Sequence, residues 1–294
     1  MAKSKCRAGL AWSGRVAERV NQQPGLRYTR RMLLCPVRNC RKPLAREAKR
    51  LVCERGHSFD VARSGYINLL QPQERRSKTP GDTPAAVEAR QRLHDRGVTV
   101  PLLDAIAEIT SVSARDTVLD AGCGDGFYLG TLAHRTGFDA HGVDISIPAI
   151  RAAARRFPPS SAERGRFEWI VANADRFIPY ADASFSLILS ITARMNSPEF
   201  RRVLRPDGRL LVAISSPEDL IELRGSGRDR AARTMEAFAG DFTLAERRRA
   251  TTHADLDAEA VRDVLISIYR PMRSEPVRPM RLTFSLDLLL FRPG

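Results

Sequence analysis

Short apolar runs alternate with amphipathic stretches from about residue 117 to residue 214. The runs are compact enough for strands, whereas the stretches between them place apolar residues at helical spacing. We predict strands at Thr117–Asp120, Ala140–Asp144, Phe167–Val171, Ser186–Ser190 and Arg209–Ile214, and helices at Phe127–Thr136, Ile147–Arg156 and Ser197–Val203. Strands that alternate with helices predict an α/β fold with a doubly wound parallel sheet.

The segments on either side extend this predicted domain. Helical patterns run from Pro84 to about Arg96 and over Val100–Ile109. Near the end, Leu256–Ile266 is predicted to be a helix and Met280–Phe291 a long final strand. We therefore assign residues 84–294 to one domain.

The first 83 residues have a different pattern. Residues 1–31 lack a sustained apolar period and are interpreted as a flexible basic arm. From residue 32 to about residue 70, short apolar runs are separated by Cys, Pro and Gly, as in a small β-rich module that cannot build its own core. Polar residues with Pro72, Pro80 and Gly81 follow, so residues 32–83 are assigned to this module and a linker.

The net charge of +14 belongs to the N-terminal third of the 294-residue chain. Residues 1–98 hold 22 basic and 8 acidic side chains, whereas residues 99–294 hold 26 of each. Such an imbalance is typical of a segment that neutralises nucleic-acid phosphates, although a solvated charged face gives the same pattern. The basic side chains that we consider for phosphate contact are Lys42, Arg46, Lys49, Arg50, Arg55, Arg63, Arg75, Arg76 and Lys78.

The sequence also bears on the compartment. No run of about 18 apolar residues occurs, and the basic start is not followed by the apolar stretch of a secretory signal. Five cysteines are an odd number in a chain too long to need disulfides, which favours metal binding or free thiols. We expect a cytoplasmic protein without a membrane anchor.

Four side chains of the basic third have the spacing of a zinc site. Cys35 and Cys40 are separated by four residues, twelve residues follow, and Cys53 and His57 are separated by three. Two close pairs of Cys and His can enclose Zn²⁺ tetrahedrally, and four protein ligands make a closed, structural site. Chance proximity of three cysteines and a histidine is the alternative. Because the module lacks a core, bound zinc would contribute directly to its folding.

A glycine-rich turn follows the first predicted strand of the large domain. Gly122, Cys123 and Gly124 lie between a hydrophobic strand and a helix, where glycines allow a ligand to approach the backbone. The spacing differs from that of dinucleotide sites, and the acid Asp120 would repel a pyrophosphate but suits a cationic amino acid. Asp144 ends the next strand, where acids accept hydrogen bonds from ribose hydroxyls. The turn therefore predicts S-adenosylmethionine binding, with a purely structural turn as the alternative.

Further cofactor contacts are expected after the second and third strands. Ile145 follows Asp144, and Asn173 and Ala174 follow the third strand, where the adenine ring would rest. Asn173 or Asp175 would read the adenine amino group, or would only cap a turn. Residues 191–196, after the fourth strand, are expected to form the floor of the acceptor pocket.

With both motifs in place, the chain resembles the bacterial 23S ribosomal RNA (guanine-N1)-methyltransferases, which include the branch that protects macrolide producers. The resemblance runs from about Cys35 to Leu223. Its most specific residues are Cys53, His57-Ser58-Phe59-Asp60, Ala62–Leu70, Pro80-Gly81-Asp82, Ala89-Arg90, Leu119-Asp120 and Gly122-Cys123-Gly124.

The resemblance implies an enzyme that transfers a methyl group from S-adenosylmethionine to guanine N1 in a 23S rRNA hairpin. It further implies that the zinc module helps to bind RNA. It is also compatible with a role in antibiotic resistance and with a homodimer.

The departures from the family pattern gather around the acceptor. Gly97-Val98-Thr99 replaces Gly-His-Tyr, Thr192-Ala193-Arg194 replaces an Ala-Pro pair, and Asp219-Leu220 replaces His-Leu. Asp219 is our candidate for the general base that removes the N1 proton, with a surface acid near a helix start as the alternative. These changes leave open a methyltransferase for a purine-like or guanidine-containing small molecule in secondary metabolism. A non-enzymatic binder that keeps the cofactor contacts is a third alternative.

Overall fold

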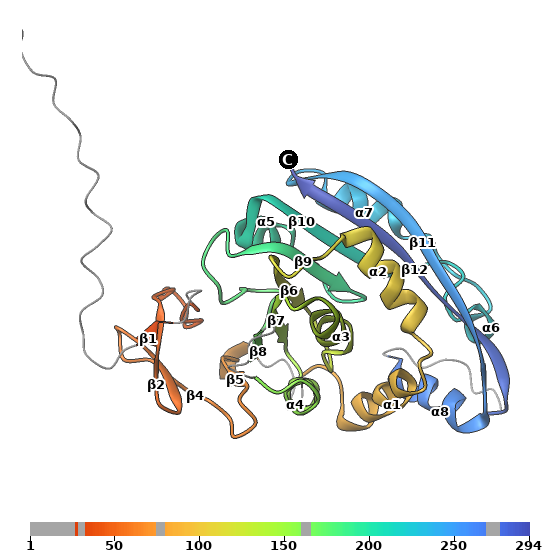
Figure 1. Ribbon diagram of the computed structural model, residues 1–294, viewed down its shortest axis with the longest axis horizontal. Helices are drawn as coiled ribbons and strands as arrows, with labels where there is room; N and C mark the ends of the chain where they lie inside the picture. The colour runs from red at the N-terminus through yellow and green to blue at the C-terminus, as the bar shows by residue number, and fades with distance from the viewer. Residues whose placement is uncertain (1–26, 29–32, 75–79, 160–165, 269–276) are drawn as a thin grey trace, which may run out of the picture.

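The computed structural model describes residues 27–28, 33–74, 80–159, 166–268 and 277–294. An eight-stranded sheet runs through the molecule in the order β11-β12-β10-β9-β6-β7-β8-β5 (Figure 1). Its strands from β10 to β5 are parallel, and β12 and β11 add to it in antiparallel fashion. The predicted α/β fold with a doubly wound parallel sheet is thus confirmed, with an antiparallel extension at one edge.

A second, four-stranded antiparallel sheet is formed by the N-terminal part of the chain. Its strands are β1 (Arg27–Tyr28), β2 (Leu44–Glu47), β3 (Arg50–Cys53) and β4 (Ser58–Asp60). Except for β1, the expected arm at residues 1–31 lies outside the described residues, as do residues 75–79 of the expected linker. Strand β5 (Ile67–Asn68) belongs to the large sheet, so the N-terminal module continues without a break into the edge of that sheet.

The parallel strands alternate with helices as the sequence predicts. They are β6 (Thr117–Ala121), β7 (Asp139–Asp144), β8 (Phe167–Val171), β9 (Phe185–Ile191) and β10 (Leu204–Ser215), and the helices that follow four of them are α3 (Phe127–Thr136), α4 (Ile147–Arg156), α5 (Ser197–Val203) and α6 (Ile221–Arg224). Helices α1 (Pro84–Asp95) and α2 (Val100–Thr110) precede them, and α7 (Ala231–Phe238), β11 (Phe242–Leu256), α8 (Ala258–Ser267) and β12 (Met280–Pro293) complete the chain.

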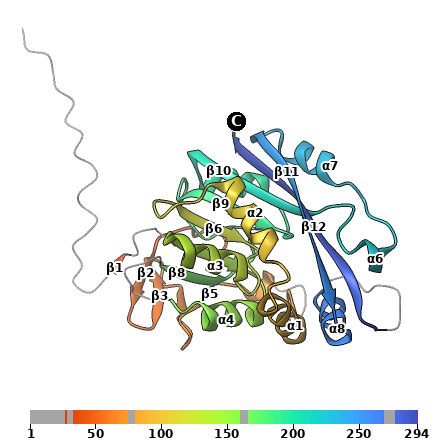
Figure 2. The ribbon, with the colours of Figure 1, turned by 45° about the vertical axis from the view of Figure 1, so that its right-hand side comes forward.

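Two apolar clusters cover the two faces of the large sheet. Val118 belongs to one cluster and its neighbour Leu119 to the other, because successive side chains of a strand point to opposite faces. The first cluster contains residues of α1, α2, α3, α4 and α8, and Figure 2 shows α2 and α3 on the same side of the sheet. The second cluster joins residues of α5 and α7 to buried side chains of the N-terminal sheet, so the small sheet shares a core with the large one.

Local signals explain where several helices begin. The side chains of Thr83, Ser146 and Asp257 accept hydrogen bonds from the first turns of α1, α4 and α8, which satisfies donors that have no partner within the helix. None of the described helices combines the length and the apolar character that crossing a membrane requires.

Candidate functional site

Cys35, Cys40, Cys53 and His57 come together in the N-terminal sheet, with their ligand atoms all within 4.8 Å of one another. Sγ of Cys40 lies 3.8 Å from Sγ of Cys53, and Nδ1 of His57 lies 3.4 Å from Sγ of both Cys35 and Cys53. A tetrahedral zinc ion with its usual bond lengths separates its ligands by about 3.5 Å for nitrogen and sulfur and by about 3.8 Å for two sulfurs. The donor set therefore fits zinc in both chemistry and spacing.

Two tight turns present these ligands. The backbone N–H of Cys35 donates to Lys42 at 2.8 Å, and that of Cys53 donates to the carbonyl of His57 at 3.1 Å. Within the second turn, Gly56 has a φ of 80°, a conformation that L side chains rarely adopt. Because three of the four ligands are buried, a metal bound here would be largely shielded from solvent.

The glycine-rich turn lies where β6 ends and α3 begins. Gly122, Gly124 and Gly126 have φ values of 87°, 55° and 75°. A Cβ atom on Gly122 would lie 2.4 Å from Cβ of Ala193, and one on Gly126 would lie 2.6 Å from the Trp169 ring. The turn therefore requires glycine both for its backbone conformation and for its close packing.

Asp144 fixes this turn from the neighbouring strand. Its Oδ2 accepts a hydrogen bond from the N–H of Gly124 at 2.9 Å, and its Oδ1 accepts one from the N–H of Ser146 at 2.8 Å. Burial raises the pKa of Asp144, and these two backbone donors counteract the increase. Ile145 is half-buried beside it.

Asp120 is buried and its Oδ1 atom has no hydrogen-bond partner among the described residues. Burial, with a further contribution from the charge of Asp144, raises the pKa of Asp120 to about 8. A buried acceptor without a partner is costly unless a ligand satisfies it. An amino acid ammonium group would do so, and the site therefore fits the cationic end of S-adenosylmethionine.

Arg90, for which the sequence pattern predicts no role of its own, faces the same turn and is paired with Asp82. Nη1 of Arg90 lies 2.6 Å from Oδ2 of Asp82, and it would lie 3.5 Å from a Cβ atom on Gly124. The backbone of Asp82 accepts a hydrogen bond from the Ser146 hydroxyl at 2.9 Å, which ties the segment before α1 to α4. Arg90 thus brings a cation to the glycine turn, and its only sequence signal is the Ala89-Arg90 pair of the family resemblance.

Asn173 and Ala174 lie after β8, half-buried and in the expected position along the sheet edge. Oδ1 of Asn173 accepts from the N–H of Asp175 at 3.2 Å, so the side chain does cap a turn. Nδ2 of Asn196, from the segment after β9, donates to the carbonyls of Ala174 at 3.2 Å and Asp175 at 2.9 Å. The two loops that border the predicted cofactor edge are therefore tied together.

Asp219 lies after β10 and is buried. Its Oδ1 accepts from the N–H of Ser285 at 3.1 Å, and its Oδ2 lies 3.2 Å from Nη1 of Arg224. Burial raises the pKa of Asp219, whereas Arg224 and the Ser285 backbone lower it. The carboxyl is therefore a buried, anchored group and not the free surface acid that was the alternative.

Thr99 joins a buried polar cluster near this edge. Its hydroxyl lies 2.7 Å from Nδ1 of His94, and the His94 ring stacks on Phe127 with a centroid distance of 3.9 Å. Burial and the neighbouring Arg90 lower the pKa of His94 to about 3, which keeps the imidazole neutral. His94 is therefore a neutral, buried side chain that packs against Phe127 and contacts Thr99.

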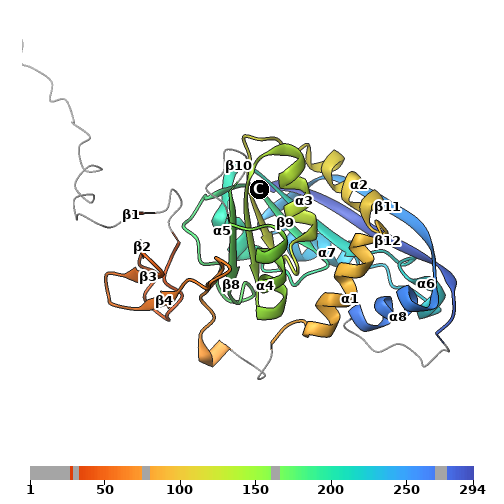
Figure 3. The same cartoon turned by 60° about the horizontal axis from the view of Figure 1, so that its bottom comes forward.

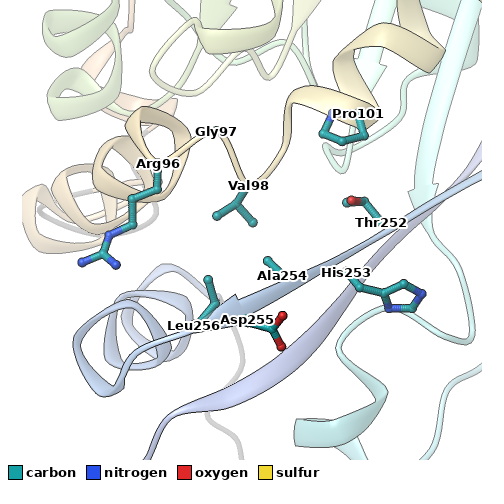
Figure 4. Close-up of a pocket in the computed structure, with 9 residues that line it drawn as sticks. All are labelled: Arg96, Gly97, Val98, Pro101, Thr252, His253, Ala254, Asp255 and Leu256. Carbon is teal, nitrogen blue, oxygen red and sulfur yellow. The ribbon is translucent and has the colours of Figure 1, made fainter.

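A pocket of about 350 Å³ lies between the turn joining α1 to α2 and strand β11 (Figure 4). None of the predicted cofactor residues lines it. Of its polar side chains, Arg96 is ion-paired with Asp257 at 2.8 Å, and Nδ1 of His253 lies 3.1 Å from the Thr283 hydroxyl.

Comparison with known proteins matches both parts of the chain. Residues 33–78 match the zinc-ribbon family described as "RlmA, N-terminal", and residues 118–208 match the family described as "Methyltransferase domain".

Curated relatives cover most of the chain. The 23S rRNA (guanine(748)-N(1))-methyltransferase of Streptomyces fradiae is 36% identical over 243 residues, which are 79% of this chain and 82% of that protein. A protein of Bacillus subtilis (strain 168), provisionally named a 23S rRNA (guanine-N(1)-)-methyltransferase, is 37% identical over 66% of this chain and 67% of its own length.

Among solved structures, a complex of the Haloferax volcanii Trm112 methyltransferase activator with a provisionally named methyltransferase contains a similar chain. The likeness has a TM-score of 0.51 at 20% identity and covers 73% of this chain and 99% of that chain. At this identity the match supports the fold alone.

Proposed function

The chain belongs to the RlmA-like family of zinc-ribbon, S-adenosylmethionine-dependent 23S rRNA (guanine-N1)-methyltransferases, and we propose that it methylates N1 of a guanine in a 23S rRNA hairpin in the cytoplasm. The observation that carries the proposal is the combination, in one chain, of a Cys-His cluster with the cofactor edge of a methyltransferase sheet. The identity to the Streptomyces fradiae enzyme, 36% over 79% of this chain, supports the same assignment.

The cofactor supplies a methyl group on a positively charged sulfur. In our proposal the glycine turn contacts the amino acid end of the cofactor. The Asp120 carboxyl accepts a hydrogen bond from the cofactor's ammonium group, and Arg90 faces the cofactor's carboxylate. Asp144 accepts from the ribose, and Asn173 lies beside the adenine. The proposed contact residues are Asp120, Gly122, Cys123, Gly124, Asp144, Ile145, Asn173 and Ala174.

Guanine N1 carries a proton at neutral pH, so methylation there requires a proton acceptor. We assign this role to Asp219. The proton leaves N1 for an oxygen of Asp219, and the electron pair of the former N1–H bond forms the new bond from N1 to the methyl carbon. The electron pair of the broken carbon–sulfur bond would leave with the sulfur, which thereby becomes neutral. The contacts to Ser285 and Arg224 hold the carboxylate in one orientation, which lowers the entropic cost of reaching the reactive geometry.

The zinc module contributes to RNA binding in this proposal. Its ligands are Cys35, Cys40, Cys53 and His57, and the chain around them presents exposed basic side chains such as Lys49 and Arg55. Binding that neutralises phosphates releases counterions, so affinity for a 23S fragment should fall steeply with salt. A target in a hairpin loop is less costly to unstack than a base within a helix.

The test is methylation of deproteinised 23S rRNA with cofactor carrying a labelled methyl group, followed by mass mapping of the modified nucleotide. A parallel reaction uses a small-molecule extract of the cells, and Asp144→Ala serves as the variant without cofactor binding. Label at guanine N1 supports the proposal. Label found only in the extract would instead identify a small-molecule methyltransferase, and expression in a macrolide-sensitive strain would test for resistance.

A further inference from the structure

The zinc module touches the large sheet at the segment that follows β8. The N–H of Leu34 donates to the carbonyl of Pro179 at 3.0 Å, and Leu33, which is fully buried, forms a β-bridge with Tyr180. Cys35, which directly follows Leu34 in the chain, is the first member of the Cys-His cluster. Figure 3 shows the small sheet beside β8, in agreement with these contacts. One peptide bond therefore separates the metal cluster from a contact with the β8–β9 segment.

Two arginines, one of them from the zinc module, contact the ring of Phe177 in the same segment after β8. The guanidinium carbon of Arg41, from the zinc module, lies 4.9 Å from the centre of the Phe177 ring, and that of Arg202, from α5, lies 5.1 Å from it. Both distances are within the range of cation–π attraction. Arg202 also donates to the carbonyls of Ile178 at 2.8 Å and Tyr180 at 2.7 Å, so the ring and the backbone after it are held together.

Phe177 in turn closes the loop that carries the proposed adenine contacts. Its N–H donates to the carbonyl of Asn173 at 3.0 Å. On the other side of the same loop, Asn196 holds the carbonyls of Ala174 and Asp175. The loop from residue 173 to residue 177 is thus fastened at one end by the segment after β9 and at the other by the zinc module.

We propose that Arg41 and Phe177 are positioning residues for the cofactor, through which the zinc module holds the 173–177 loop in its adenine-binding conformation. The inference rests on the proposed cofactor role of Asn173 and Ala174. A loop that is already ordered loses less conformational freedom when the ligand binds, and the gain appears as affinity. The zinc module therefore strengthens cofactor binding even when RNA is absent.

The experiment compares Arg41→Ala with Arg38→Ala in the full-length, zinc-loaded chain. Arg38 is an exposed arginine three residues before Arg41, so both substitutions remove one positive charge from the same module. Binding of S-adenosylhomocysteine is measured by calorimetry without RNA, well below the unfolding temperature of each variant. Loss of one cation–π contact at an exposed arginine is expected to raise the Kd of Arg41→Ala about two- to fivefold, with the Kd of Arg38→Ala equal to that of the parent chain.

A double-mutant cycle with Phe177→Leu sharpens the comparison. If Arg41 acts through the Phe177 ring, Arg41→Ala should change the Kd little in a chain that already carries Phe177→Leu. The KM for the cofactor should follow the Kd, while kcat at saturating cofactor stays unchanged.

Equal Kd values for Arg41→Ala and Arg38→Ala, whether both normal or both raised, would overturn the inference, as would additive effects in the cycle. A parent chain that binds no S-adenosylhomocysteine would instead refute the proposed function.

Discussion

Asp120 and Asp144 lie near the carboxyl ends of the adjacent strands β6 and β7, and the charge of Asp144 adds to burial in raising the pKa of Asp120 to about 8. The two carboxyls have different surroundings. Backbone N–H groups satisfy both oxygens of Asp144, whereas Oδ1 of Asp120 has no partner among the described residues. Near neutral pH the ligand-free protein therefore holds Asp120 mostly protonated, and only a cationic ligand would favour its ionised form.

Cofactor binding should consequently depend on pH. A ligand ammonium group favours ionised Asp120, so its binding releases a proton, and affinity rises as the pH rises toward 8. Calorimetry with S-adenosylhomocysteine between about pH 6 and pH 8 should show a Kd that falls by up to about tenfold per unit. Asp120→Asn should bind more weakly and without this slope; a parent chain with a flat profile would contradict the assignment.

The raised pKa of Asp120 should also make the stability of the ligand-free protein fall as the pH rises, whereas cofactor affinity rises. The folded-state pKa lies above the unfolded value of about 3.9, so the folded chain holds a proton that the unfolded chain has lost, and stability decreases as the pH rises from about 4 to about 8. Asp120→Asn removes this penalty. We expect the variant to melt at least about 3 °C higher than the parent at pH 8, and no higher near pH 4. Thermal unfolding at the two pH values measures the difference.

Much of the fold follows from local pattern, and strand β11 shows why the remainder does not. Most of its side chains between Phe242 and Leu256 are exposed, so no apolar alternation marks the strand. It forms because β12 pairs with it along its length, and Arg249 contacts the buried Asp287 opposite at 2.9 Å. A cross-strand ion pair between residues far apart in sequence leaves no local signal.

In the candidate site, too, some features follow from local sequence and others depend on the packing of distant segments. The Cys-His cluster and the glycine turn are local in sequence, and spacing alone predicted the ligands that the fold brings together. Arg90 reaches the glycine turn from α1, and the anchoring of Asp219 depends on Ser285 in β12. These relationships arise only when distant segments pack, so spacing could not reveal them.

Removing a zinc ligand should destabilise the N-terminal sheet and its packing against the large sheet. Purified chain is expected to hold one zinc ion, and Cys53→Ser should lose it, because three ligands no longer close the tetrahedron. The variant should also unfold at a lower temperature, since the small sheet shares its apolar cluster with the large one. Metal analysis and thermal unfolding provide the measurements. Cys6→Ser, outside the ligand pattern, is the matched control and should retain full zinc.

The ion pair between Asp219 and Arg224 gives the clearest test of the proposed base. Asp219 must be ionised to accept the N1 proton, so activity should decline on the acid side of its pKa. Arg224 lowers that pKa, with 3.2 Å between the charged atoms. Arg224→Gln should therefore shift the acid limb of the kcat profile to higher pH, by a modest amount because the arginine is partly exposed.

The variants around this pair separate a base from a structural anchor. At high pH, Arg224→Gln should regain the parent rate, since Asp219 is then ionised even without the positive charge of the arginine. Asp219→Asn should bind S-adenosylhomocysteine normally but lose at least about a hundredfold in kcat at every pH. Arg228→Gln, an exposed neighbour, should leave the profile in place. If Asp219→Asn keeps the parent rate, or if Arg224→Gln lowers kcat equally at all pH values, Asp219 only anchors β12 and another group takes the proton.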